Sequence, residues 1–219
     1  MSLIKNFIDF ILHLDKYLSV IIQNYGTLTY FILFAIIFAE TGFVVTPFLP
    51  GDSLLFAAGS FAAIGALNVI WVFAVVAVAA ILGDTINYSI GKFLGSQAFR
   101  KHPRIFKEEY LEKTEKFYKK YGNKAIILGR FVPVVRTFAP FVAGVGKMKY
   151  SNFLFYNIIG GILWTALFVF GGFYFGNIPL IKNNFSVVII IIIILSFVPI
   201  AWEFGKHKTH SFRNIFKQG

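Results

Sequence analysis

Four charged side chains lie inside stretches of this sequence that are otherwise apolar enough to sit in a membrane: Glu40, Asp52, Arg130 and Arg136. One isolated charge at the centre of a bilayer costs about 2.5–3.5 kcal/mol, so four unpaired charges would cost roughly 10 kcal/mol. That sum is comparable to the stability of a whole domain. The two acids lie in the first half and the two arginines in the second. We therefore expect the four to pair in one polar centre, and we place the function there.

Prolines and a glycine interrupt the apolar runs beside these charges. The predicted break positions are Pro47, Pro50, Gly51, Pro133 and Pro140. A proline removes one amide donor and clashes with the preceding turn, so it disfavours a continuous helix. Irregular backbone is tolerated at membrane depth only where protein or a water-filled cavity satisfies its polar groups. The sequence therefore predicts two interrupted helical hairpins around the charges.

The composition sets the class of protein. The chain has 219 residues, of which 57% are hydrophobic and only 14% charged, with a mean hydropathy of +0.71. A soluble domain carries about 25% charged residues, so this is an integral membrane protein. The absence of cysteine excludes disulfides and thiolate metal sites, and we expect no metal and no cofactor. We assign the net charge of +11 to membrane orientation and anionic lipid headgroups, and not to nucleic acid.

Polarity along the chain predicts an all-α fold. The two hairpins are called re-entrant because their arms fall short of the roughly 20 residues that a spanning helix needs. In order, the expected segments are an amphipathic helix 1–24, a hairpin 27–67, a spanning helix 68–94, a surface helix near 107–121, a hairpin 124–147, a spanning helix 151–176, a C-terminal spanning helix 177–205 and a basic tail 206–219.

An internal repeat relates the two halves. Tyr25-Gly26 precedes Glu40 by the interval at which Tyr121-Gly122 precedes Arg136, and the FAAG of 56–59 recurs as the FVAG of 141–144. One spanning helix separates the copies, so they enter the membrane from opposite faces. Inverted repeats with interrupted helices that meet at the midplane are typical of transporters. The basic loop 95–123 and the basic tail are expected in the cytoplasm by the positive-inside rule.

Two motifs in this layout resemble the DedA family, also called the VTT or SNARE-associated-Golgi domain. They are Glu40–Ser53 (ETGFVVTPFLPGDS) and Gly129–Gly144 (GRFVPVVRTFAPFVAG). The supporting matches are Gly83, Asp84, Tyr88, Gly91, Gly95, Asn157, Gly160 and Trp164. The resemblance covers residues 25–176 in order and spacing.

The resemblance implies a multi-pass protein of the bacterial inner membrane that supports the envelope. Bacterial members resemble flippase-like transporters of phospholipid or of a polyprenyl phosphate such as undecaprenyl phosphate, some of them dependent on the proton gradient, and eukaryotic relatives are scramblases. The implied partners are membrane lipids and protons. The key acids and arginines of the family fall here on Glu40, Asp52, Arg130 and Arg136.

Each site residue also has a structural interpretation. Arg130 and Arg136 offer planar forks that could clamp a phosphate, or they could simply neutralise the motif acids. Glu40 and Asp52 could exchange protons if they alternate between apolar surroundings and an arginine partner, although Asp52 or Ser53 could instead cap a helix.

Two further groups carry weaker signals. Asp84 and Asn87 share one helical face and could line a cavity or bond to another helix. The three tryptophans are interpreted as lipid-facing or interfacial belts.

Other functions compete with lipid transport. The same acids could serve a proton- or cation-coupled antiporter of small solutes, and a basic loop with purely architectural charges could belong to a membrane scaffold. An enzyme is disfavoured, because the sequence supplies no recognisable nucleophile–base pair or metal cluster. The sequence makes no prediction of the oligomeric state.

Overall fold

The computed structural model describes residues 14–43, 51–94, 108–182, 184, 187–188 and 190–191, and over these residues it is helical without a strand. The expected all-α class is thereby confirmed. The helices are α2 (Leu14–Tyr25), α3 (Leu28–Gly42), α4 (Gly51–Ala63), α5 (Val69–Leu94), α7 (Glu108–Tyr121), α8 (Ala125–Gly129), α9 (Pro133–Val145), α10 (Tyr150–Phe175) and α11 (Pro179–Lys182). Residues 1–13, the first proline break with Pro47 and Pro50, and most of the predicted 177–205 helix and 206–219 tail lie outside this part.

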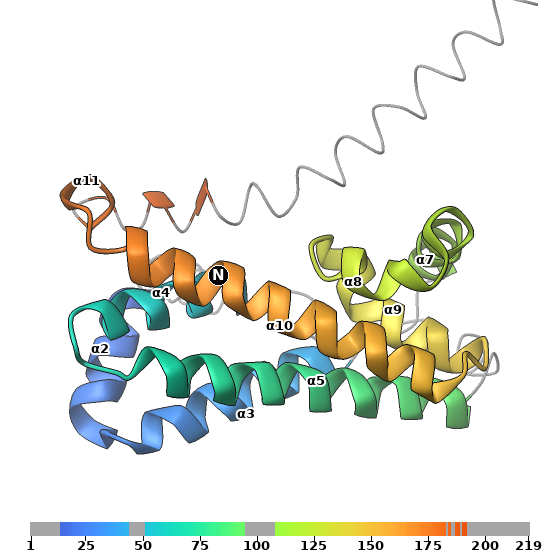
Figure 1. The fold of residues 1–219 in the computed structure, drawn as a ribbon, viewed down its shortest axis with the longest axis horizontal. Helices are drawn as coiled ribbons and strands as arrows, with labels where there is room; N and C mark the ends of the chain where they lie inside the picture. Colours follow the sequence, from blue (N-terminus) through green and yellow to red (C-terminus); the bar gives the residue numbers. More distant parts are fainter. Residues whose placement is uncertain are drawn as a thin grey trace, which may run out of the picture.

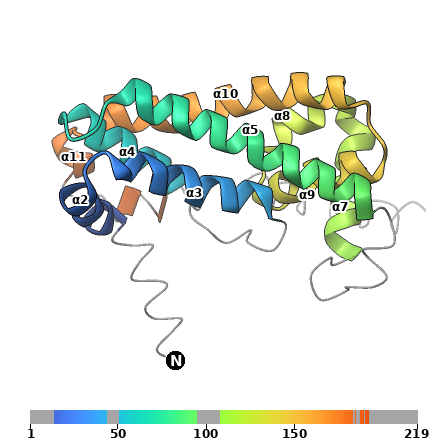
Figure 2. The ribbon, with the colours of Figure 1, turned by 90° about the horizontal axis from the view of Figure 1, so that it is seen from below.

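Two long helices form the frame of the molecule. α5 and α10 each have 26 residues, which corresponds to about 39 Å at 1.5 Å per residue. Both are long and apolar enough to cross a membrane, and they match the predicted spans 68–94 and 151–176. They pack against each other along the long axis of the molecule (Figures 1 and 2). Asn68 caps α5, because its Oδ1 accepts hydrogen bonds from the amides of Ile70 and Trp71.

The remaining apolar helices are shorter. α3 has 15 residues, and α4 and α9 have 13 each, so each is about 20–22 Å long. This is less than the roughly 30 Å thickness of the hydrocarbon core. None of them can therefore span a bilayer alone, as the hairpin prediction requires, while the re-entrant path itself stays a prediction.

The two prolines of the second motif behave differently. The chain turns at Arg130–Val132, and Pro133 then occupies the first turn of α9, where no amide donor is needed. A turn therefore separates α8 from α9 directly before Pro133. The predicted break at Pro140 is wrong, because α9 runs through this residue to Val145. Pro140 cannot donate a backbone hydrogen bond to the preceding turn of α9. The helix continues because α9 packs against α5 and α7.

Glycines allow close contact at two helix crossings, and at each crossing both helices contribute one. α4 packs on α10, and α9 packs on α5. A Cβ at Gly172 of α10 would collide with the carbonyl oxygen of Phe56 on α4, and a Cβ at Gly91 of α5 would collide with that of Phe141 on α9. Phe56 and Phe141 are the equivalent positions of the sequence repeat. These glycines therefore allow close packing at both crossings.

The facing helices α4 and α9 each contribute an equivalent glycine to their crossing. A Cβ at Gly59 of α4 would meet the carbonyl oxygen of Val169, and one at Gly144 of α9 would meet that of Tyr88. Each crossing therefore uses one glycine from either helix, so that two backbones come into direct contact. The two copies of the sequence repeat therefore make the same kind of helix–helix contact.

We expect Gly172→Ala and Gly91→Ala each to destabilise the protein by about 1–3 kcal/mol, because the added methyl has only rigid backbone to push against. Gly171→Ala is the matched control, since the nearest atom to its new Cβ is Cδ2 of Phe56 at 4.0 Å. That control should be neutral or slightly stabilising, as alanine favours helix over glycine. Thermal unfolding in detergent measures all three. Equal effects at Gly171 and Gly172 would refute the close-crossing explanation.

A Tyr-Gly pair ends one helix in each half. Gly26 follows α2 with a φ of 52°, and Gly122 follows α7 with a φ of 56°. This left-handed conformation is the one in which glycine commonly terminates a helix. α7 itself confirms the predicted surface helix, and it joins α9 through the Tyr118 hydroxyl, which donates to the carbonyl of Ala139 over 2.9 Å.

Candidate functional site

Arg136 joins three helices through two carboxylates. From α9, its Nη2 donates to Oε1 of Glu40 on α3 over 2.7 Å, and its Nη1 donates to Oδ1 of Asp52 on α4 over 2.6 Å. The exposed fractions of the three side chains are 9% for Arg136, 2% for Glu40 and 14% for Asp52. Two carboxylates face one guanidinium, so this group, which we call the Arg136 cluster, carries a net charge of −1 when both acids are ionised.

Trp164 completes the Arg136 cluster from α10. Its Nε1 donates to Oδ1 of Asp52 over 3.0 Å, and the guanidinium of Arg136 lies 5.5 Å from the centre of its ring. The side chain is fully buried, so the interpretation of Trp164 as an interfacial belt residue is wrong. The hydrogen bond to a buried carboxylate accounts for its place in the core. Trp71, in contrast, is 63% exposed on α5, as a lipid-facing residue should be.

Local backbone explains how the two acids come together. Gly51 starts α4 directly against the side chain of Glu40, and a Cβ at Gly51 would collide with that carboxylate. Asp52 follows in the first turn of α4, where a negative charge interacts favourably with the helix dipole. Its side chain is nevertheless directed to Arg136 and Trp164.

Arg130 belongs to a second group. It lies in the turn between α8 and α9, and its Nη2 donates to Oδ2 of Asp84 over 2.5 Å and to Oδ1 of Asn157 over 2.6 Å. Asn157 in turn donates to the carbonyl of Ile81. We call Arg130, Asp84 and Asn157 the Arg130 cluster. Its ion pair is neutral overall and more deeply buried, with side-chain exposures of 1% and 3%.

Small residues on α10 make room for the Arg130 side chain. A Cβ at Gly160 would lie 3.1 Å from its Cδ, and one at Gly161 would lie 3.5 Å from its Nη2. Both Nε and Nη1 of Arg130 are buried and have no hydrogen-bond partner among the described residues, and the same holds for Oδ1 of Asp84. The cluster is thus strongly paired but retains unused donors.

Asn87 connects the two halves next to the Arg136 cluster. Its Nδ2 donates to the carbonyl of Thr41 over 3.2 Å and to that of Thr137 over 2.9 Å. These threonines directly follow Glu40 and Arg136, so they are equivalent in the repeat. Of the two interpretations of Asn87, the hydrogen bond between helices describes the structure.

The two arginines are thus divided between clusters. Arg136 meets both motif acids, as the pairing of opposite charges predicted, whereas Arg130 meets Asp84. In this arrangement acids occupy both guanidinium groups, so they do not converge on one open phosphate site. Sequence reasoning assigned no role in the polar centre to Asn157 or Trp164, although a polar amide in an apolar helix was a usable signal for Asn157.

Comparison with known proteins places these residues in a family. The VTT domain family matches residues 49–174. The chain is 50% identical to Protein DedA of Escherichia coli K12 over 95% of this chain and 96% of that protein. It is 43% identical to the uncharacterized membrane protein Rv0364 of Mycobacterium tuberculosis H37Rv, over 75% and 73% of the two chains. It is 34% identical to the inner membrane protein YqjA of Escherichia coli K12, over 68% and 69%. No solved structure matches.

Proposed function

This chain is a membrane protein of the DedA family, and from that premise we propose that it moves an anionic lipid between leaflets by sheltering its phosphate headgroup. Relatives named inner membrane proteins support the bacterial inner membrane as its location. A polyprenyl phosphate such as undecaprenyl phosphate is the substrate we favour. The acyl or prenyl tail stays in the bilayer, so only the head needs a polar path.

The observation that carries the proposal is the pairing of Arg136 with two acids from different helices. The same guanidinium fork fits two phosphate oxygens as well as it fits carboxylates. With its net charge of −1, the Arg136 cluster repels an anionic headgroup while both acids are ionised. Phosphate binding therefore requires that an acid takes up a proton or moves away from Arg136.

Glu40 is the acid that we assign to the proton. One of its oxygens is held by Arg136, and the other, Oε2, is buried without a hydrogen-bond partner among the described residues. A proton on Oε2 would remove the negative charge that competes with phosphate. Asp52 is more exposed and also accepts a hydrogen bond from Trp164, so it keeps a donor when it separates from Arg136.

We assign Arg130 to a supporting role in this scheme. It is buried and held by Asp84 and Asn157. Its unused donors, Nε and Nη1, are buried and add positive potential while Nη2 stays bonded to Asp84 and Asn157. Of the two arginines, Arg136 is the one that can exchange its carboxylate partners for a phosphate, because the residues around it come from three separate helices, α3, α4 and α10.

The test is leaflet exchange of a polyprenyl phosphate in liposomes containing purified protein, with and without a pH gradient. We expect the native chain to exchange the lipid at a rate that depends on the pH gradient. We expect Glu40→Gln to exchange it at a rate that no longer depends on the gradient. Lys92→Gln, which removes an exposed charge on α5, is the control and should behave as the native chain. No exchange by folded native protein in either condition would reject this substrate class and favour the antiporter or scaffold.

A further inference from the structure

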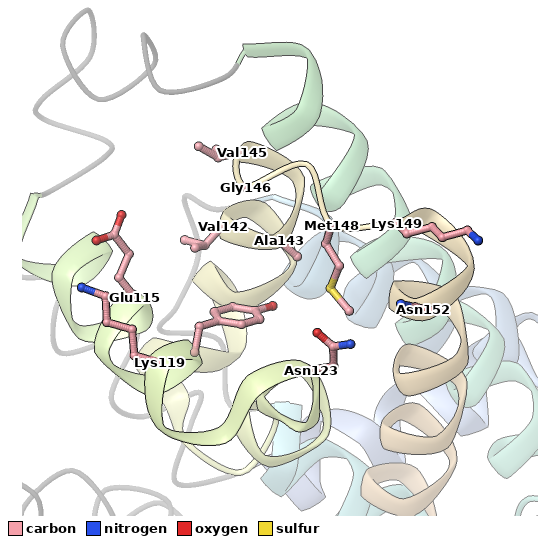
Figure 3. A pocket seen from close by; sticks show the side chains of 11 residues that line it. Glu115, Lys119, Asn123, Val142, Ala143, Val145, Gly146, Met148, Lys149 and Asn152 are labelled. Carbon is pink, nitrogen blue, oxygen red and sulfur yellow. The ribbon is translucent and has the colours of Figure 1, made fainter.

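A hollow of about 530 Å³ lies away from the polar centre, between α7, α9 and the first turn of α10. Figure 3 shows α7 on one side and α9 with the start of α10 on the other. Its inner surface is mainly apolar and includes Tyr118, Val142, Ala143 and Met148. None of its lining residues belongs to the Arg130 or Arg136 cluster. The volume is in the range of small-molecule sites.

The rim of the hollow is charged. Lys119 on α7 and Lys149 before α10 border it from opposite sides, and both are exposed. In Figure 3 their side chains extend outward from the hollow, whereas Asn123 points across it toward Met148. Glu115 lies one helical turn before Lys119, a spacing that favours their interaction. Long cationic side chains around an apolar interior are the arrangement that faces lipid phosphates at a membrane surface.

Two hydrogen bonds fix the positions of the segments that line the hollow. Tyr118 donates to the carbonyl of Ala139 on α9, and Tyr88 of α5 donates to the carbonyl of Met148 over 2.5 Å. Burial, followed by the negative charge of Asp84, raises the pKa of the Tyr118 hydroxyl, so this group remains a donor at any working pH. The hollow is therefore preformed.

We propose that this hollow binds one anionic phospholipid, with a segment of its acyl chain on the apolar floor and its phosphate at the rim between Lys119 and Lys149. Charge complementarity selects this occupant. The segment 95–107, which precedes α7 in the sequence, is a poorer one, because it carries Arg100, Lys101, Arg104 and Lys107 without an acid. The inference goes beyond the proposed function, since binding here requires neither of the two clusters and no transport.

Native mass spectrometry of the purified protein, titrated with phosphatidylglycerol or phosphatidylcholine, tests the proposal. We expect the native chain to retain one phosphatidylglycerol in preference to phosphatidylcholine. Lys119→Gln/Lys149→Gln should weaken phosphatidylglycerol binding by about thirtyfold, because each lysine near anionic lipid contributes about 1 kcal/mol. Asn123→Trp, which fills the hollow from an exposed position, should abolish the retained lipid.

The matched control is Lys92→Gln/Lys124→Gln, which removes the same charge from exposed residues that do not line the hollow. Circular dichroism and thermal unfolding confirm that each variant is folded. Equal weakening by the control pair would show diffuse attraction and overturn the proposal. Lipid retention by folded Asn123→Trp, or no preference in the native chain, would overturn it as well. None of these experiments measures transport. Their outcomes therefore do not test the role that we propose for the Arg136 cluster.

Discussion

Arg136→Gln is expected to lower the stability of the protein by about 3–5 kcal/mol and to abolish lipid exchange. The substitution leaves Glu40 and Asp52 close together and buried without their cation. Removing one partner of a buried ion pair is far more costly than removing all of them. The defect should become smaller at acid pH, because protonated carboxyls no longer repel each other. Chemical unfolding in detergent over a pH series measures the effect on stability.

A triple variant separates stability from transport. Adding Glu40→Gln and Asp52→Asn to Arg136→Gln removes every charge of the Arg136 cluster, and most of the lost stability should return. Lipid exchange should stay absent, because no cation remains to hold the phosphate. A triple variant that folds and exchanges lipid at the native rate would refute the role of Arg136 and support a purely architectural cluster.

The second large effect is expected at the Arg130 cluster. Arg130→Gln and Asp84→Asn should each cost about 3–5 kcal/mol, since both leave one charge unpaired in a site that is almost closed to solvent. The double variant should cost much less than the two single variants together, because neither charge remains. A double-mutant cycle from unfolding measurements in detergent gives this coupling directly.

Transport distinguishes the two arginines. If Arg130 supports the site without binding the headgroup, the Arg130→Gln/Asp84→Asn variant should exchange lipid measurably, unlike any variant that lacks Arg136. A folded double variant without exchange would place Arg130 on the substrate and restore the two-arginine clamp. Additive single costs would instead show that the pair contributes little and that each residue acts through other contacts.

The sequence was most informative where one physical effect is large. The spans α5 and α10 follow from long apolar runs, and the high cost of intramembrane charge pointed to Glu40, Asp52 and Arg136 as partners. Those three residues come from separate segments, yet opposite charge left few other ways to pair them. The family motifs then supported the same positions independently.

The rest depended on tertiary packing that no local pattern reports. Spacing alone could not show that Arg130 turns to Asp84 on α5 and not to a motif acid. Composition placed Trp164 with the belt residues, because a buried indole and an interfacial one look alike in a sequence. Pro140 stays inside α9 because the neighbouring helices hold the turn on either side of it, which overrides the local preference.

The contact between Glu40 and Arg136 also determines which halves can assemble. The two residues occupy the same place in the repeat, so two copies of the first half would bring carboxylates together, and two copies of the second would oppose guanidinium groups. Like charges at such short range repel strongly in a poorly hydrated interior. Each half is therefore specific for the other and excludes itself. The sign of one side chain, more than the shape of the helices, makes this a protein of two unlike parts that cannot be rebuilt from either part used twice.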